Sequence, residues 1–413
     1  MTFDRRKFIQ ATGAGLGVSA LGFPAIVRGQ GAPIRLGLMT VKTGPLAAGG
    51  IHLEQGITTF LREKDFKLAG RKVDLVVADT GGSPLGAKSK AVELVERDKV
   101  DLIMGPLAAF ELLAIVNYLA EKKVPALGFA GAEDVTQRHE NPFFVRTSDS
   151  SAQCLYPLAD YAIKEMKVGR AVTMADDFAF GYEQIGGFQK VFEDKGGRVV
   201  KKLWSPLNTP DYTPYIAQIE DCDVICMGLV GSNPLKFTKQ ARGYGIKQPL
   251  IGGSTVADDT IVSNFGDEAI GMINSIPYAF DLDTEANKRF IASMRKYFGA
   301  NVPIGFYAAC LYVNGQIVEA ALEKTGGKSD DSAQFIKAIK SVSLVSTPRG
   351  PVSFDDHGNI VFDCYIRRID KVNGKLVNKT VKTYPKVGQF WTYDAKTFLQ
   401  EPVFSRDFPP MRN

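Results

Sequence analysis

The sequence has few of the side chains that most often bind metals or act as catalytic bases. Only three of its 413 residues are histidines and five are cysteines, and both kinds are scattered along the chain. Cys222 and Cys226 are close in sequence, but they lie in a segment typical of a strand, where four residues span about 13 Å. That separation is too long for a disulfide bond. We therefore expect buried free thiols, no zinc-type ligand cluster and no bound cofactor.

The motifs of common hydrolases and nucleotide-binding enzymes are also missing. The sequence has no G-x-S-x-G, no H-E-x-x-H and no P-loop. An S-x-x-K pattern ends at Lys296, and Lys42 and Lys324 each begin a K-T-G triplet, as in serine β-lactamases, but the S-D-N element is absent. The carboxylate pairs at 176–177 and 258–259 fall where Asp usually caps a helix. We therefore predict that the protein has no catalytic residues and is not an enzyme.

Neither sign of charge is in large excess. The formal net charge is +5, and the first 31 residues carry four basic side chains against one acidic, which leaves 46 basic and 44 acidic side chains in the rest. A nearly neutral body predicts no nucleic-acid partner. The content of 45% hydrophobic and 23% charged residues is that of a globular protein, and the length predicts about two domains.

The first 31 residues read as an export signal. Arg5 and Arg6 precede a short apolar stretch, which is interrupted by Gly and Pro and is too short to span a membrane. The paired arginines resemble a twin-arginine signal, so we expect export of the folded protein to the periplasm, with cleavage between Ala25 and Ala32. A dinucleotide-type G-x-G-x-x-A pattern at 15–20 lies within this signal and lacks the preceding strand that such a site requires.

From Ile34 onward, strand-like and helix-like segments alternate in two similar passages. This alternation predicts an α/β fold with two doubly wound parallel-sheet lobes. Three helices and a β-rich end follow, with hairpin turns at 356–358 and 373–374. No low-complexity linker separates the passages, so we expect the chain to cross between the lobes more than once. The expected strands are 34–41, 73–78, 101–104, 124–129, 170–174, 199–204, 224–227, 249–251 and 270–276, and the three later helices are 284–298, 306–324 and 332–341.

Several short segments occur in the order found in one protein family. They are Ile34–Leu38, Thr43–Leu46, Asp79, Val100–Pro106, Val124–Ala126, Phe144–Thr147, Asp177–Gly181, Gln240–Ile246, Gly266–Gly271, Tyr307–Ala309 and Gly350–Asp355. Over nearly all of residues 32–370, the sequence resembles type I periplasmic solute-binding proteins of ABC transporters. The closest subgroup is that of the branched-chain amino-acid (Leu/Ile/Val) receptors.

The resemblance implies two lobes joined by a three-stranded hinge that crosses several times. The first lobe would comprise 32–147 plus 278–350, and the second 148–277 plus 351–413, including a C-terminal extension that has no assigned role. Ligand would bind in the cleft between the lobes, which close on it. The closed protein, a monomer, would then deliver the ligand to an ABC permease in the inner membrane.

The resemblance also implies where the ligand binds. In the first lobe, its carboxylate would meet backbone amides at two turns, where relatives often carry Ser or Thr. In the second lobe, a pocket aromatic stands before Gly181, and Ser254 takes the place of an acid that holds the ammonium group in amino-acid receptors. Gly49 stands where relatives have an aromatic residue. The predicted ligand-binding residues are Ala108, Ala109, Phe110, Ala132, Glu133, Phe180, Ser254 and Tyr307.

These departures from the family pattern bear on the ligand. A buried ammonium group needs an acidic partner, and a missing aromatic widens the pocket. We predict a small carboxylate ligand with an aromatic or bulky apolar body and no amino group. A branched-chain or other neutral amino acid is the alternative. A receptor that feeds a sensor kinase and an exported α/β hydrolase are more distant ones.

Overall fold

The computed structural model describes residues 31–412. The predicted export signal and the dinucleotide-type pattern at 15–20 lie outside these residues, apart from Gly31 at the end of the signal. Among the described residues, no helix combines the length and the apolar character that a membrane crossing requires. The compact unit begins at Ala32, which is where the alternation of strands and helices starts.

The first sheet has six strands in the order β2-β3-β1-β4-β5-β6. All neighbouring strands in it are parallel except β2 and β3. Its central strand is apolar almost throughout and is buried on both faces, as parallel sheets require. Its strands are β1 (Ile34–Thr40), β2 (Lys67–Leu68), β3 (Arg71–Asp79), β4 (Leu102–Met104), β5 (Ala126–Gly128) and β6 (Phe144–Arg146).

The second sheet has eight strands, in the order β12-β13-β11-β10-β9-β7-β8, with β14 paired to β13. The core from β8 to β11 is parallel, but β13 runs antiparallel to each of its three neighbours, so this sheet is mixed. Its strands are β7 (Arg170–Asp176), β8 (Arg198–Ser205), β9 (Val224–Gly228), β10 (Leu250–Gly252), β11 (Ile273–Ile276), β12 (Val352–Phe354), β13 (Ile360–Val372) and β14 (Lys375–Val387).

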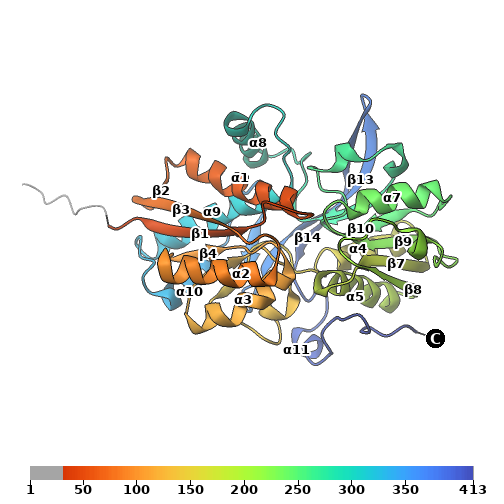
Figure 1. Cartoon of the computed structure of the whole chain (residues 1–413), viewed down its shortest axis with the longest axis horizontal. Helices are drawn as coiled ribbons and strands as arrows, with labels where there is room; N and C mark the ends of the chain where they lie inside the picture. The colour runs from red at the N-terminus through yellow and green to blue at the C-terminus, as the bar shows by residue number, and fades with distance from the viewer. Residues whose placement is uncertain (1–30, 413) are drawn as a thin grey trace, which may run out of the picture. The chain divides into compact units, whose positions relative to one another are not determined.

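Helices cover both sheets, as an α/β fold requires (Figure 1). With the first sheet lie α1 (Ala47–Glu63), α2 (Pro84–Val92), α3 (Ala109–Glu121), α8 (Glu285–Phe298), α9 (Phe306–Lys324) and α10 (Ser332–Lys340). With the second lie α4 (Leu155–Lys164), α5 (Ala179–Asp194), α6 (Thr213–Ile216) and α7 (Asn233–Gly243). We call these two groups the first lobe and the second lobe.

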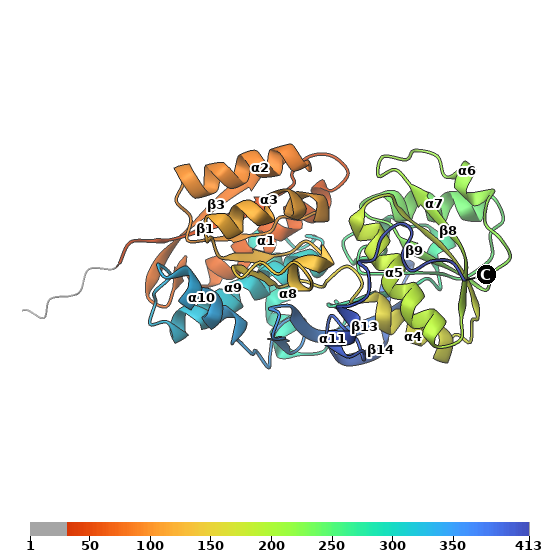
Figure 2. The same cartoon turned by 90° about the horizontal axis from the view of Figure 1, so that it is seen from below.

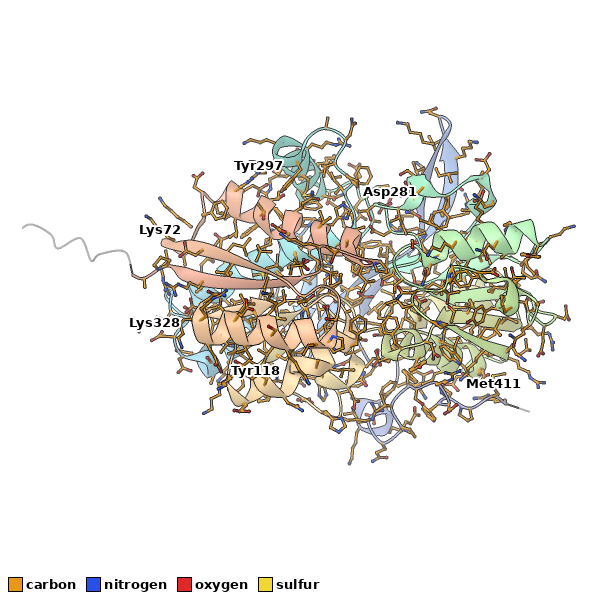
Figure 3. All side chains as sticks on the ribbon, viewed as in Figure 1. Lys72, Tyr118, Asp281, Tyr297, Lys328 and Met411 are labelled. Atoms are coloured by element: carbon orange, nitrogen blue, oxygen red, sulfur yellow. The ribbon has the colours of Figure 1, made fainter. Side chains whose placement is uncertain are left out.

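The chain passes between the lobes three times. It leaves the first sheet after β6, returns after β11 to form α8, α9 and α10, and leaves again to form β12 and β13. The return brings Lys328 to the same outer edge as Lys72 of β3 (Figure 3), where Arg71 donates to the Gly327 carbonyl at 2.7 Å. The crossing segments are also joined directly, because the Arg146 amide donates to the Gly358 carbonyl at 2.9 Å. The exact domain boundaries stay a prediction.

The predicted α/β fold with two lobes is confirmed, and most predicted elements lie within a few residues of their expected bounds. The turn at Asn373 and Gly374 has positive φ at both residues, 49° and 77°, as a type I′ hairpin requires. The strands it joins, β13 and β14, have 13 residues each and are longer than the segments 361–369 and 377–381 that the sequence pattern predicts. All five cysteines are free and buried, including Cys226 within β9.

Close packing of α1 on α9 holds the first lobe together. A Cβ atom added at Gly56 of α1 would overlap the backbone carbonyl of Ala308, and one added at Gly315 of α9 would overlap the Phe60 ring. Glycine at these positions lets the two helices approach more closely than side chains would allow. Since α9 carries Tyr307 and α1 follows the loop around Gly44, this contact also positions two walls of the cavity described below.

We predict that Gly56→Ala destabilises the protein, because the added methyl group meets backbone that cannot move independently. Overpacking of this kind costs about 2 kcal/mol of unfolding free energy, which urea denaturation would measure. The control is Gly243→Ala in α7, where a Cβ meets nothing within 4 Å. That change should be neutral or stabilising by up to about 1 kcal/mol. Equal losses from both substitutions would contradict the packing argument.

Candidate functional site

A cavity of about 350 Å³ lies between the lobes at the carboxyl ends of the parallel strands. Open α/β sheets bind ligands at this edge. Both lobes line the cavity, and aliphatic and aromatic side chains make up much of its wall. The lining residues are Gly44, Pro45, Leu46, Ala48, Gly49, Leu107, Ala108, Ala109, Phe129, Gly131, Asp149, Phe178, Phe180, Val230, Gly231, Ser232, Leu235, Ser254, Thr255, Asp258, Thr260, Ile261, Asn264, Phe306 and Tyr307.

Five helices begin at or beside the cavity: α1, α3, α5, α7 and α9. The first turn of a helix has backbone N–H groups without intrahelical partners, and it carries a partial positive charge. In α3, the Ala108 amide donates to Glu111 Oε2 at 3.0 Å, whereas the amides of Ala109 and Phe110 have no acceptor within residues 31–412. No Lys, Arg or His belongs to the lining of this cavity. The cavity therefore offers an anion backbone donors in place of a basic side chain.

Aromatic rings from both lobes face the cavity. In the first lobe, Phe129 stacks on Tyr307 with ring centroids 5.5 Å apart, and Phe306 lies 5.2 Å from Phe129. In the second lobe, Phe178 and Phe180 stack at 6.2 Å. Two stacked ring pairs on opposite walls suit a flat apolar body between them.

The structure shows what stands next to Gly49. A Cβ atom there would lie 2.9 Å from the Tyr307 ring. Tyr307 thus occupies the space beside Gly49, and the missing aromatic does not leave the cavity open at this point. The expectation of a widened pocket therefore does not hold at Gly49, because the Tyr307 ring forms this wall.

Two carboxyl groups reach the cavity, and sequence reasoning assigned neither of them to it. Asp149, in the first crossing segment, accepts a hydrogen bond from Ser254 Oγ at 3.0 Å. Burial raises the pKa of Asp149, although the Ser254 hydroxyl and the charge of Arg349 oppose that rise. Asp258 accepts from the Phe306 amide at 2.9 Å and from the Thr260 hydroxyl at 2.6 Å. Asp258 thus caps the first turn of α9, 48 residues further along the chain, and not a helix that begins beside it.

Five of the eight predicted ligand-binding residues line the cavity: Ala108, Ala109, Phe180, Ser254 and Tyr307. Their binding role stays a prediction. The other three, Phe110, Ala132 and Glu133, are not among the lining residues. The Phe110 ring packs against Phe178 of the second lobe at 5.7 Å, so it supports the wall from behind.

Ala132 and Glu133 lie in the loop between β5 and β6, beside the hinge. Arg146 Nη2 donates to the Ala132 carbonyl at 2.7 Å. The Glu133 carboxylate accepts from the Ser150 hydroxyl at 2.7 Å and from the Ala152 amide at 2.8 Å. The Glu133 amide, a predicted donor to the ligand carboxylate, is also engaged, because it donates to Glu183 Oε1 at 3.2 Å. A position-by-position comparison could not reveal this, because the partners of Glu133 lie 17 and 19 residues further along the chain.

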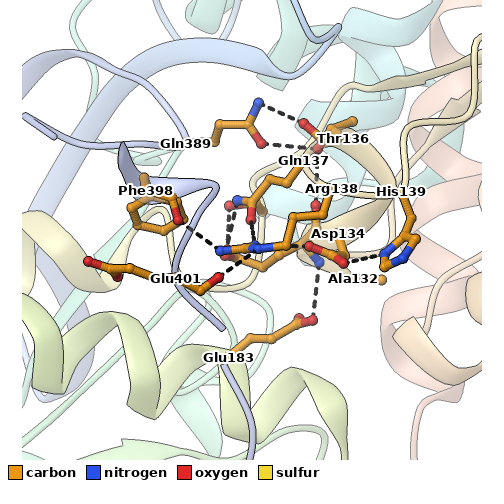
Figure 4. Close-up of polar contacts among 12 residues, drawn as sticks. Ala132, Asp134, Thr136, Gln137, Arg138, His139, Glu183, Gln389, Phe398 and Glu401 are labelled. Atoms are coloured by element: carbon orange, nitrogen blue, oxygen red, sulfur yellow. Dashed lines mark hydrogen bonds and ion pairs between the residues drawn. The ribbon is translucent and has the colours of Figure 1, made fainter. Parts of the chain in front are cut away.

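The seam beside the hinge contains a second buried carboxyl group (Figure 4). The Glu133 amide, in the first lobe, donates to Glu183 Oε1 of α5 at 3.2 Å, and the Ser151 hydroxyl donates to Glu183 Oε2 at 2.5 Å. Burial and the nearby Glu133 carboxylate raise the pKa of Glu183 to about 8, against the opposing charge of Arg146. This raised pKa favours the protonated form of Glu183 at neutral pH.

Comparison with known proteins gives a consistent result. Residues 33–375 match the sequence profile of a family described as periplasmic binding protein. A protein of Brucella melitensis named Leu/Ile/Val-binding protein homolog 6 is 28% identical over 366 residues, which are 86% of this chain and 92% of that protein.

Solved structures agree. A solute-binding protein of an ABC transporter from Rhodopseudomonas palustris BisB5, in complex with 3,4-dihydroxybenzoic acid, is 30% identical with a TM-score of 0.80, over 86% of this chain and 98% of that one. Another from R. palustris, in complex with 4-hydroxybenzoate, is 30% identical with a TM-score of 0.81, over 87% and 98%.

We predict that Glu183→Gln makes the protein less sensitive to alkaline pH. The unfolded Glu183 carboxyl ionises at its ordinary pKa of about 4.3, so the stability that the native proton contributes is complete below that pH and is lost as pH rises through about 8. A neutral Gln should leave the variant roughly 1–3 kcal/mol more stable than the wild type at pH 9. Urea unfolding at pH 5 and pH 9 measures the difference.

The matched control is Glu165→Gln, which removes a half-exposed carboxylate paired with Lys382 at the end of α4. Its alkaline profile should follow that of the wild type. A stability gap between Glu183→Gln and the wild type that does not widen from pH 5 to pH 9 would contradict the prediction.

Proposed function

Since this chain belongs to the periplasmic binding protein family, and is therefore a periplasmic substrate-binding protein of an ABC transporter, we propose that its ligand is an aromatic carboxylic acid. The carboxylate would meet the unbonded amides at the start of α3, and the ring would lie between the two stacked aromatic pairs. We further propose that the protein is a monomer, is exported by the twin-arginine pathway and delivers its ligand to an inner-membrane permease.

The observation that carries the proposal is the combination of aromatic walls with helix N-termini. An aromatic acid needs an apolar slot and an anion site, and the cavity combines both without any basic side chain in its lining. Two solved relatives that are 30% identical hold hydroxybenzoates. The family and fold are those of transport proteins and not of enzymes.

The two lobes are in contact around the cavity, which suits binding by closure. A Cβ atom at Gly231 of the second lobe would lie 2.6 Å from the Pro45 carbonyl of the first. Phe110 meets Phe178 across the same gap. A ligand that contacts both walls would favour this closed arrangement by its differential affinity for it.

A neutral amino acid is the second candidate, and one specific observation favours it. Ser254 stands where amino-acid receptors carry the acid that holds the ammonium group of the ligand. The Ser254 hydroxyl, however, contacts the carboxyl group of Asp149. A carboxylate therefore does reach this part of the cavity from another segment. One relative is also named as a Leu/Ile/Val-binding protein homologue.

We predict that 4-hydroxybenzoate stabilises the purified protein strongly and that L-leucine does not. A ligand that binds only the native state raises unfolding free energy by about 2.7 kcal/mol at a hundred times its Kd. Thermal unfolding with each ligand, followed by calorimetric titration, measures this. A large shift with leucine and none with 4-hydroxybenzoate or benzoate would reject the aromatic-acid proposal.

We also predict that Asp149→Asn separates the two candidates. Asn removes a negative charge from the cavity, so an aromatic acid should bind as well as before or better. An amino acid would lose the partner of its ammonium group, which corresponds to about 1.5–3 kcal/mol of binding free energy. The control is Glu165→Gln, which removes a negative charge from outside the cavity lining and should leave the affinities within a few-fold of wild type. An aromatic acid whose affinity falls more than tenfold in Asp149→Asn would contradict this prediction.

A further inference from the structure

The chain continues beyond the second sheet as a segment that lies against both lobes. We call residues 388–412 the C-terminal strap. It begins after β14, contains the short helix α11 (Ala395–Phe398), and lies outside the range that matches the family, 33–375. Figure 1 shows α11 at the junction of the lobes and the chain continuing below α5, and Figure 2 shows α11 beside β13 and β14. Met411, near its end, lies on the side of the second lobe (Figure 3).

The strap is anchored to the first lobe mainly through Arg138, which follows the short helix at 133–136. Arg138 Nε donates to the Glu401 carbonyl at 2.9 Å, and Nη2 donates to the Phe398 carbonyl at 3.0 Å (Figure 4). The guanidinium also lies 5.7 Å from the centre of the Phe398 ring. Nearby, Gln389 Nε2 donates to the Thr136 carbonyl at 3.1 Å. These bonds attach the strap to the loop between β5 and β6.

The strap is anchored to the second lobe along α5. Lys190 pairs with Glu401 at 2.8 Å, and Gln189 Nε2 donates to the Pro410 carbonyl at 2.9 Å. A Cβ atom at Gly186 would lie 2.5 Å from the Phe404 ring, so that ring packs directly on the helix backbone. Glu401 therefore contacts Lys190 of the second lobe through its side chain and Arg138 of the first lobe through its carbonyl.

A row of aromatic rings stiffens the strap between these anchors. Phe390 contacts Phe398 at 5.4 Å, Phe398 contacts Phe404 at 5.9 Å, and Phe404 contacts Phe408 at 6.4 Å. Phe398 and Phe404 are buried. A segment with rings packed in this way does not lengthen freely when its two anchors are pulled apart.

The strap also reaches the edge of the cavity. Arg406 Nη1 donates to both carboxylate oxygens of Asp177, at 3.0 and 2.9 Å, and the Tyr182 hydroxyl donates to the same carboxylate. Asp177 directly precedes Phe178, which lines the cavity. A shift of the strap would therefore move a wall of the site.

We propose that the C-terminal strap is a positioning element that holds the two lobes closed over the ligand, an inference that rests on the binding function proposed above. In this proposal, opening the cleft would move the loop that carries Arg138 away from α5, to which the loop is also joined by the bond from the Glu133 amide to Glu183. Such a movement breaks the hydrogen bonds from Arg138 to the strap or separates the strap from α5. The strap thus shifts the equilibrium between open and closed forms toward the closed form, and it slows the release of ligand.

The test compares Arg138→Ala with the wild type in two independent readouts. The first is the radius of gyration of the ligand-free protein by small-angle X-ray scattering, which should increase because the open form becomes more populated. The second is the dissociation rate of 4-hydroxybenzoate in stopped-flow measurements, which should rise about tenfold for the loss of two hydrogen bonds from a charged group.

The matched control is Arg412→Ala. Arg412 pairs with Glu193 at 3.0 Å, so it belongs to the same strap and the same helix, but its partners lie in the second lobe alone. This variant should match the wild type in both readouts. An unchanged radius of gyration in Arg138→Ala, or equal effects of Arg138→Ala and Arg412→Ala, would overturn the proposal. If wild type does not bind 4-hydroxybenzoate, the proposed ligand fails, and the scattering comparison still decides the role of the strap.

Discussion

The direction of the parallel strands determines where this protein can hold a ligand. Neighbouring strands in the parallel part of each sheet run the same way, so the helices that follow them begin at one edge. In this chain, α1, α3, α5 and α7 follow β1, β4, β7 and β9 at that edge, and α9 adds a fifth N-terminus. Two such edges face each other across the cavity. The backbone alone therefore supplies donors and partial positive charge on both walls.

The same geometry explains how the cavity tolerates buried acids. An isolated buried carboxylate costs several kcal/mol, and no basic side chain lines this cavity. Asp258 avoids that cost by accepting from the first turn of α9, and the Ser254 hydroxyl serves Asp149. Glu183, in the hinge seam, lies where Glu133 adds a like charge, which raises the pKa of its carboxyl group and favours the protonated form. Each acid is thus stabilised by a donor, a helix end or protonation.

The alternation of strands and helices was sufficient to predict the two lobes, because hydrophobic periodicity and turn residues are local signals. The hairpin at Asn373 and Gly374 could be predicted for the same reason. Glu133 could not be placed, since its partners Ser150 and Glu183 come from later segments that meet it only in the folded chain. The aromatic residues of the strap follow no helical or strand period, so the sequence did not predict their packing. That packing on α5 depends on the absence of a side chain at Gly186.

The two candidate ligands differ in charge, which makes Asp149 the residue that separates them. A neutral amino acid carries both charges, so it adds no net charge and needs an acid near its ammonium group. An aromatic acid adds one negative charge to a cavity that already holds two carboxyl groups. Burial raises the pKa of Asp149, and a second negative charge nearby would favour its protonated form further. Protonation of Asp149 would therefore favour an anionic ligand over a zwitterion on the same backbone.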